Sequence, residues 1–329
     1  MNRLHFYVKF MEERGVAPQD VLANTGLTLD AVSHEQFQPS PQQFSSAIEN
    51  MLDIAGDGVG IEAGLSWSIS NFGMFGYALM SCNTMRDIHG LWQRYFPLTT
   101  SLLNYDSYRV SGNWVVELKD HFPLGRARTF AVEEHIARII KTCPGIIGKR
   151  DFGFRQIQLT GPAPAHKHLY EKHFGCEVKF GQRVDRIILD EKYLECRLSF
   201  ANENVSKTCE QHCMRLLKDI ADQEKLPQKV KRQLVYNYDK HPTLQEVAKM
   251  VGLSARSFRR QLKEADTSFQ RLLDEVRLDF AMQYLQNTDL TPKEISYRVG
   301  YSNVSKFRRA MKAWTGKKLS DFRKTAVGE

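Results

Sequence analysis

The sequence predicts an α+β N-terminal domain, followed by an all-α C-terminal domain in which a linker helix joins two helix-turn-helix motifs. Three observations predict this fold class. One helix-turn-helix pattern occurs twice in the last third of the chain, at 244–263 and at 292–312. Patterns typical of short strands occur before residue 200, between helical patterns. A length of 329 residues is enough for two domains.

The first 200 residues mix helical patterns, punctuated by Gly and Pro, with strand patterns. Alternating Trp114, Val116 and Leu118 follow a Ser111-Gly112 turn, which predicts a β-hairpin. We expect helices at 4–15, 18–25, 29–33, 42–54, 85–96 and 127–142, and a loop leading into a buried helix at 71–81. We expect strands at 102–110, 113–118, 155–159, 177–180 and 186–189.

A polar helical stretch follows the last strand. Its composition suits a connector, and a further helix at 225–238 begins the C-terminal part. We therefore place the N-terminal domain at 1–200, the connector helix at 201–222 and the tandem helix-turn-helix domain at 223–329.

The first helix-turn-helix copy reads LQEVAKMVGLS and continues as ARSFRRQLK over residues 244–263. Val247 and Val251 belong to an apolar stripe on one face of its first helix. Gly252 permits the left-handed turn that ends this helix, and Ser254 is placed to cap the second helix.

A linker helix is expected between the two copies, at 268–286. Its apolar residues fall on one side of the helix. At 1.5 Å per residue it spans about 28 Å, which is close to the roughly 34 Å between successive major-groove faces of DNA. Both copies are therefore able to read the same side of one duplex.

The second copy reads PKEISYRVGYS and continues as NVSKFRRAMK over residues 292–312. It aligns with the first copy at an offset of 48 residues up to Gly300, after which one extra residue makes the offset 49. Ser302 is expected to cap its second helix. Two copies with paired arginines favour a DNA-binding function over the alternative of two ordinary helical hairpins.

The second helix of each copy has one apolar side, and Arg and Lys on the opposite side. A helix of this kind enters the major groove with its basic side chains directed at base edges or phosphates. We expect DNA contacts from Ala255, Arg256, Ser257, Arg259, Arg260, Lys263, Asn303, Val304, Ser305, Lys306, Arg308, Arg309 and Lys312.

The distribution of charge supports the same interpretation. Residues 242–324 hold 17 basic and 9 acidic side chains, a net charge of +8, and the rest of the chain holds 29 of each. The whole excess of positive charge therefore lies in the repeat region, as expected of a surface that neutralises phosphates. A basic membrane-binding surface would need exposed large apolar residues, which are used here for packing.

Other classes of protein find little support in the sequence. The N-terminus lacks the apolar core of a signal peptide, and no apolar stretch approaches the length of a membrane span. We therefore expect a cytoplasmic protein that binds no membrane. No catalytic motif is present, so we expect neither an enzyme nor a cofactor.

The six cysteines include one pair at helical spacing. Cys209 and Cys213 lie four residues apart, with His212 between them. A redox or metal role is the less favoured alternative, since no second ligand cluster occurs at zinc-like spacing. We expect the Cys209 and Cys213 thiols to serve as small packing side chains of the helix, and we expect no metal site.

The C-terminal residues, from about 227 to 324, resemble the AraC/XylS family of bacterial transcription regulators. The resemblance rests on both helix-turn-helix copies, on the Arg-x-x-x-Ala-x-x-x-Leu pattern at 277–285, and on the Trp-Thr-Gly at 314–316. Met311 and Leu319 depart from the common Phe and Pro, and both positions are apolar. The resemblance implies that base-facing positions are occupied by Arg256, Arg259, Arg260 and Arg309.

The front domain resembles the sensor domain of one subgroup, the arabinose-operon-regulator type that differs from a cupin barrel. The residues that carry this resemblance are Gly-Met-Phe-Gly-Tyr-Ala-Leu at 73–79, the segment 84–95, and Tyr-x-x-x-Phe-Gly-x-x-Val-x-Phe at 170–180. It implies a domain that binds a small effector and dimerises. An aromatic group is a candidate effector pocket, with plain core packing as the alternative: Phe72, Phe75, Tyr77, Trp92 and Tyr95.

Together, these features predict a cytoplasmic, homodimeric regulator that binds double-stranded DNA and responds to a small-molecule effector. The resemblance implies an activator that contacts RNA polymerase, while the residues themselves leave activation and repression open. One alternative is a ligand-independent regulator whose front domain only dimerises or binds a protein partner. A third, disfavoured by the missing catalytic motifs, is an enzyme domain fused to a DNA-targeting module.

Overall fold

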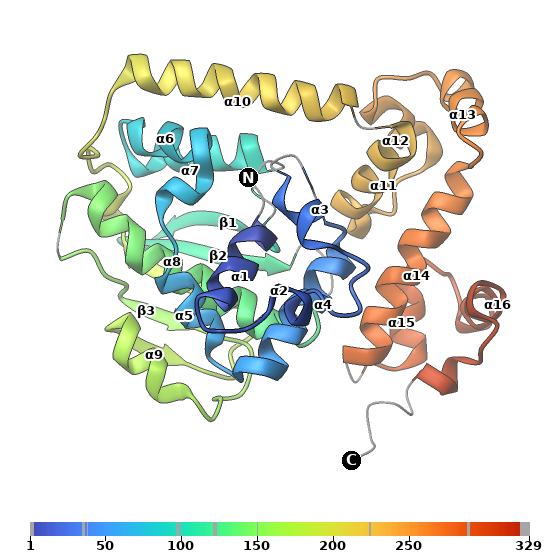
Figure 1. The fold of residues 1–329 in the computed structure, drawn as a ribbon, viewed down its shortest axis with the longest axis horizontal. Coiled ribbons are helices and arrows are strands. Elements are labelled where there is room, and N and C mark those ends of the chain that lie inside the picture. Colours follow the sequence, from blue (N-terminus) through green and yellow to red (C-terminus); the bar gives the residue numbers. More distant parts are fainter. Residues whose placement is uncertain are drawn as a thin grey trace. The chain divides into compact units, whose positions relative to one another are not determined.

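The computed structural model describes residues 3–34, 37, 39–96, 99, 101–120, 124–149, 151–223, 225–287 and 290–322 (Figure 1). The chain divides into two compact units. The first consists of residues 1–120 and 126–219, and the second mainly of residues 220–329. Helices occur in both units, and the strands of the described residues all lie in the first.

The first unit is a mixed α/β fold, as predicted. Its helices are α1 (Arg3–Glu12), α2 (Pro18–Val21), α3 (Leu29–Ser33), α4 (Pro41–Ala55), α5 (Val59–Leu65), η1 (Ile69–Phe72), α6 (Gly73–Ser81), α7 (Met85–Tyr95), α8 (Ala127–Ile147), α9 (Lys167–Phe174), η3 (Glu191–Tyr193) and α10 (Glu203–Gln223). Its strands are β1 (Leu103–Val110), β2 (Asn113–Asp120), β3 (Gln156–Gln158), β4 (Glu177–Lys179) and β5 (Arg186–Asp190). The sequence patterns did not predict α5 and α9, which are both short.

The five strands form one sheet in the order β1-β2-β5-β3-β4. All neighbouring pairs are antiparallel except β3 and β4. The predicted hairpin is confirmed, because β1 and β2 pair on either side of a turn at Ser111 and Gly112, which both have positive φ. Trp114 pairs with Leu189 and Val116 with Ile187, so these four buried side chains line one face of the sheet.

Helix α8 lies at the centre of the first unit and packs closely against α5. A Cβ atom built on Gly60 would lie 2.8 Å from the carbonyl oxygen of Phe130, and one on Gly64 would lie 2.5 Å from that of Glu134. The two glycines therefore allow the helix backbones to approach. Several charged residues of α8 are buried as a result, among them Glu133, Glu134 and Arg138.

The second unit is all-helical within its described residues. Its helices are α11 (Leu226–Tyr236), η4 (Tyr238–Lys240), α12 (Leu244–Met250), α13 (Ala255–Glu264), α14 (Phe269–Asn287), α15 (Pro292–Arg298), α16 (Val304–Thr315) and η5 (Leu319–Phe322). Helices α12 and α13 form the first helix-turn-helix motif, α15 and α16 form the second, and α14 joins them (Figure 1). Both predicted motifs and the linker helix are confirmed.

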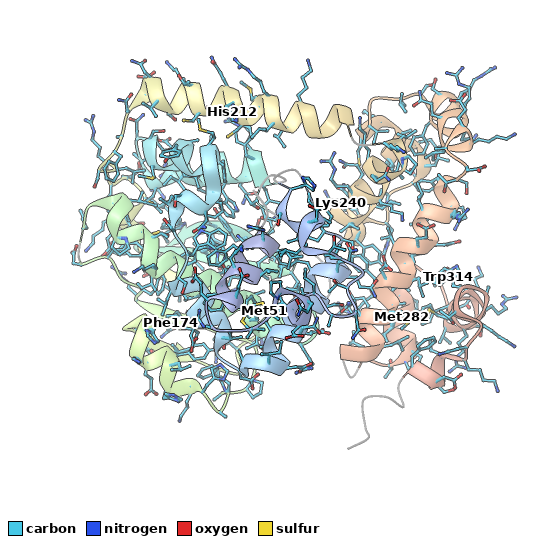
Figure 2. All side chains as sticks on the ribbon, viewed as in Figure 1. Met51, Phe174, His212, Lys240, Met282 and Trp314 are labelled. Carbon is cyan, nitrogen blue, oxygen red and sulfur yellow. The ribbon has the colours of Figure 1, made fainter. Side chains whose placement is uncertain are left out.

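Helix α10 contains the cysteine pair considered above. Cys209 and Cys213 are free and buried, whereas His212 on the same helix is exposed (Figure 2). Burial raises the pKa of the Cys213 thiol to about 11. Among the described residues, no group of three or more His, Cys, Asp and Glu side chains is arranged to hold a metal ion.

Candidate nucleic-acid interface and ligand cavity

Both helix-turn-helix motifs begin with the same capping arrangement. Thr243 caps α12, and its side chain and backbone N–H pair with Glu246. Thr291 and Glu294 repeat this arrangement on α15. The sequence carries this signal as Thr-x-x-Glu at the same offset of 48 residues, and it fixes where the first helix of each motif begins.

Glycine turns connect the two helices of each motif. Gly252 has φ +73° and Gly300 has φ +79°, so both occupy the left-handed region as predicted. Ser254 caps α13 by accepting a hydrogen bond from the backbone N–H of Ser257 at 3.2 Å. The capping residue of α16 is Asn303, which accepts from the N–H of Lys306 at 2.9 Å.

The prediction that Ser302 caps α16 was therefore wrong by one residue. The extra residue after Gly300 moves the start of the helix, so that Asn303 occupies the position equivalent to Ser254. Ser302 is exposed, and its hydroxyl accepts from Nζ of Lys306 at 3.4 Å.

Each recognition helix, α13 or α16, is anchored by two fully buried apolar side chains. Phe258 and Leu262 anchor α13, and Phe307 and Met311 anchor α16. At about 100° of rotation per residue, the positions opposite these anchors are 256, 260 and 263 in α13 and 305, 309 and 312 in α16. The opposite face of each helix is thus polar and exposed.

The predicted DNA-contact residues take two kinds of position. The half-buried ones begin the helices and face partly inward: Ala255, Ser257 and Val304. The exposed ones cover the outer faces and their flanks: Arg256, Arg259, Arg260, Lys263, Asn303, Ser305, Lys306, Arg308, Arg309 and Lys312. The two motifs exchange one basic position, since Arg256 of α13 corresponds to Ser305 of α16 and Ser257 of α13 corresponds to Lys306 of α16.

Most of the basic side chains on these faces lack an acidic partner among the described residues. Arg260 is the exception, since its Nε lies 3.6 Å from a carboxylate oxygen of Glu264. Arg308, Arg309 and Lys312 line an open concavity of about 550 Å³ together with Lys318. Positive charge concentrated in this way favours binding of phosphate.

Helix α14 is fixed to both motifs by specific contacts. Arg277 donates a hydrogen bond from Nη2 to the carbonyl oxygen of Gly300 at 3.1 Å, and its guanidinium lies over the ring of Tyr301 at 4.9 Å. Towards the first motif, the ring of Phe269 lies 6.2 Å from that of Phe258 of α13, and Phe280 stacks on Tyr238 of η4 with ring centroids 3.5 Å apart. Helix α14 therefore contacts both motifs.

A second candidate site lies inside the first unit, between α7, α8 and the sheet. It is a cavity of about 90 Å³. Val116 and Ile187 belong to its sheet wall, Ile88 to its α7 wall, and Ile139 and Arg138 to its α8 wall. Its lining is therefore mostly apolar, with a buried guanidinium at one side.

Several polar atoms around this cavity have no hydrogen-bond partner among the described residues. They are the ring atom Nε2 of His135, the ring atom Nδ1 of His89 and the indole Nε1 atoms of Trp92 and Trp114. His135 is 3% exposed, and burial, with Arg138 and Arg3 nearby, holds its pKa well below the usual value, so its ring is neutral. Unpaired buried polar atoms are rare in folded proteins and mark places where a partner binds.

The five aromatic residues proposed as an effector pocket are placed differently from one another. Of these, Trp92 lines the cavity. Phe72, Phe75 and Tyr95 are buried and stack on one another or on Trp92 at centroid distances of 5.6–6.2 Å. Tyr77 is 53% exposed, on the surface of α6.

The sequence patterns did not point to the polar residues of the cavity. His135 and Arg138 lie on α8 among Ile136, Ala137 and Ile139, within a helix whose apolar stripe alone was used to predict it. The sequence did contain a signal for buried polar residues, because charged residues occur on more than one face of an otherwise apolar helix. Such a helix buries some of its charges if it lies in a core.

Two family models match the chain. The model of the arabinose-binding domain of AraC transcription regulators, N-terminal part, matches residues 15–198. The model of a helix-turn-helix domain matches residues 247–325. Among the described residues, no helix combines the length and apolar composition needed to span a membrane.

Curated relatives agree with these matches. An ornithine utilization regulator of Pseudomonas aeruginosa is 31% identical over 265 residues, which cover 80% of this chain and 78% of that protein. An uncharacterised HTH-type transcriptional regulator of Mycobacterium tuberculosis is 29% identical over 316 residues, covering 94% of this chain and 92% of the relative. The crystal structure of the transcriptional regulator CdpR from Pseudomonas aeruginosa aligns at 22% identity with a TM-score of 0.40, covering 87% of this chain and 99% of that one.

The two family models cover the two units of the fold in turn, and the second model covers the helix-turn-helix motifs described above. The protein is accordingly a DNA-binding transcription regulator. The chain belongs to the AraC family of transcription regulators, with an arabinose-binding-type N-terminal domain and a helix-turn-helix C-terminal domain.

Proposed function

We propose that this regulator changes its affinity for DNA when a small molecule binds the cavity between α7, α8 and the sheet. The observation that carries the proposal is the set of unpaired polar atoms around an apolar cavity, at His135, Trp92 and Trp114. A cavity with a few convergent polar groups is the usual form of a ligand site. One relative is named for ornithine utilization, which agrees with regulation by a metabolite.

We further propose that the outer faces of α13 and α16 contact the operator. Arg256, Arg259 and Arg260 of the first motif and Arg309 of the second read base edges, and the flanking lysines and Arg308 bind phosphates. The supporting observations are the exposure of these side chains and the rigid attachment of both motifs to α14. An Arg side chain with two free donors matches the acceptors of guanine in the major groove.

The functional form in this proposal is a homodimer that binds a repeated site and, as an activator, contacts RNA polymerase. Support comes from the AraC-type N-terminal domain and from the two units, each with its own core. Linking two DNA-binding units raises affinity for a double site through effective concentration.

The test begins with selection of an operator from random DNA by the full-length protein. The purified protein is then screened by thermal shift against amino acids, organic acids and sugars, and each hit is added to an operator-binding titration. A ligand that stabilises the protein and changes operator affinity by fivefold or more supports the proposal, since specific ligands stabilise by mass action. If no compound class changes operator affinity, the ligand-independent regulator is the correct alternative.

A further inference from the structure

We propose that the cavity between α7, α8 and the sheet binds the carboxylate of a small molecule with a short apolar chain, and that Arg138 is its principal partner. The inference rests on the proposed effector response, because it names the chemical class of that effector. It is carried by the hydrogen-bonding character of the groups that surround the cavity.

The protonation state of His135 follows from its neighbour. Its Nδ1 lies 2.9 Å from Nη2 of Arg138. A guanidinium donates hydrogen bonds and accepts none, so Nδ1 of His135 must be the acceptor. A neutral ring then carries its proton on Nε2, and this atom is the one without a partner.

Three of the unpaired groups are therefore donors, and the fourth, Nδ1 of His89, donates or accepts according to how Nε2 of that ring pairs with the Ser107 hydroxyl. His135 offers Nε2–H, and Trp92 and Trp114 offer indole N–H groups, which can only donate. The Nη1 atom of Arg138 is a further donor without a partner among the described residues, because the two hydrogen bonds of this side chain use Nε and Nη2. A ligand that satisfies these donors must be rich in acceptors.

A carboxylate fits this requirement better than other common groups. Its two oxygens accept about four hydrogen bonds, and its bonds to a guanidinium are charge-assisted and can be bidentate. A sugar hydroxyl must also donate, and an ammonium group would be repelled by Arg138. Water can occupy the cavity, but it brings no charge to the buried guanidinium.

The guanidinium of Arg138 is held in place before any ligand binds. It lies 5.5 Å from the ring centroid of Phe72 and 5.6 Å from that of Trp92. Its Nε donates to Glu134 at 3.1 Å, and the same carboxylate lies 3.7 Å from Nη1 of Arg3. One carboxylate thus serves two guanidinium groups, which favours entry of a second anion beside Arg138.

The size and walls of the cavity limit the rest of the ligand. Ile88, Val116 and Ile139 form apolar walls. A volume of about 90 Å³ is smaller than the roughly 150 Å³ of a cavity that binds benzene. A carboxylate with a chain of about two to four carbons therefore fits, and longer chains must force the walls apart.

The experiment titrates full-length protein with acetate, propionate, butyrate, pentanoate and octanoate, and with butyramide and butylamine as uncharged and cationic controls. Tryptophan fluorescence reports occupancy, because Trp92 and Trp114 line the cavity. We expect saturable binding with the tightest Kd at propionate to pentanoate, and at least tenfold weaker binding of butyramide and butylamine. Equal affinity for butyrate and butyramide, or no response to any acid, would overturn the proposal.

Two variants and one control test the assignment of residues. Trp114→Phe keeps an aromatic ring and removes one donor, so its Kd for butyrate should rise about threefold to tenfold. Arg138→Gln should abolish butyrate binding, provided that circular dichroism shows this variant to be folded. If it does not fold, the Kd of Trp114→Phe for butyrate tests the assignment instead. Trp314→Phe makes the same change on α16 in the second unit (Figure 2) and should keep the wild-type Kd. A wild-type Kd for Trp114→Phe would contradict the assignment.

The same titration separates this inference from the proposed function. If short carboxylates fail to bind while a compound of another class changes operator affinity, the ligand class is wrong and the effector response stands. If butyrate binds through Trp114 and Arg138 but no acid changes operator affinity, the site is correct and the effector response is wrong.

Discussion

Individual side chains on the recognition helices differ in how freely they can reach DNA. Arg256 and Arg259 have no acidic partner among the described residues, whereas Arg260 lies near Glu264. The corresponding positions of the second motif include Ser305 in place of Arg256. Lys306 in turn stands where the first motif has Ser257, so each recognition helix presents four basic side chains, one of them at a different position.

Replacement of Arg260 by alanine tests its role in base reading. We expect Arg260→Ala to lose about 1–3 kcal/mol of binding at one base pair of the operator and to relax sequence preference there. A titration against the selected operator and its single-base variants measures both effects. Arg271→Ala is the control, since Arg271 is exposed on α14, is not part of either recognition helix and pairs with Glu275, so this variant should bind as wild type. Unchanged binding by both Arg259→Ala and Arg260→Ala would exclude α13 as a base-reading helix.

The pKa of His135 makes stability depend on pH in a defined direction. Burial, Arg138 and Arg3 hold the folded-state pKa well below 6.5, so the unfolded chain takes up a proton near pH 6.5 that the folded chain does not. Stability from this group is present above pH 6.5 and is lost as pH falls, by up to about 1.4 kcal/mol per pH unit.

Urea unfolding at pH 7.5, 6.5 and 5.5, followed by tryptophan fluorescence, measures this dependence. We expect the midpoint to fall between pH 6.5 and pH 5.5 in the wild type. His135→Gln keeps an acceptor for Arg138 but does not titrate, so its profile should be flatter over the same interval. Parallel profiles for the two proteins would show that His135 does not titrate as inferred.

Among the elements, we expect α14 to determine how the two motifs are phased on DNA. Its buried residues before position 278 are Leu272 and Val276, and those after it include Phe280 and Ala281. One alanine inserted after Leu278 rotates the later residues by about 100° relative to the earlier ones. Phe280 would then leave its stack with Tyr238.

We therefore expect the alanine insertion to abolish specific operator binding almost completely. Non-specific, salt-sensitive binding should remain, because the basic side chains are unchanged. Footprinting on the selected operator measures the loss, and Leu278→Ala, which keeps the helical register, should retain the wild-type footprint. An unchanged footprint for the insertion would mean that the two motifs bind DNA independently.

At the scale of the whole molecule, each of the two units has its own buried core. The second unit contains both helix-turn-helix motifs and α14, with its own buried residues. A fragment beginning near Asp222 should therefore fold and bind DNA as a monomer. Full-length protein should bind more tightly if the first unit dimerises, because the second half-site is then reached at high effective concentration.

Affinities of the fragment and of the full-length protein are to be compared on DNA with one and with two half-sites. We expect the full-length protein to gain at least tenfold on the double site and little on the single site, and sedimentation to give a dimer. The fragment should gain little from the second half-site. Equal affinities of both proteins on the double site would rule out a dimerising front domain.

The DNA-binding unit was predictable from the sequence because its signals are local. Helical periodicity, the glycines at 252 and 300, and the basic recognition helices are properties of short segments, and they recur at a constant offset. The misplacement of the α16 cap at Ser302 shows the limit of such signals, since one inserted residue moved the helix start to Asn303.

The first unit was predictable in its class and in most of its elements, but not in its cavity. Local clustering of aromatic residues suggested a pocket, yet four of those five residues form no part of the cavity lining. The cavity brings together Trp92 of α7, Trp114 of β2 and Arg138 of α8. These residues become neighbours only when the helices close over the sheet. Burial of a charge depends on such distant contacts, so only the tertiary structure decided which polar groups of α8 line the cavity.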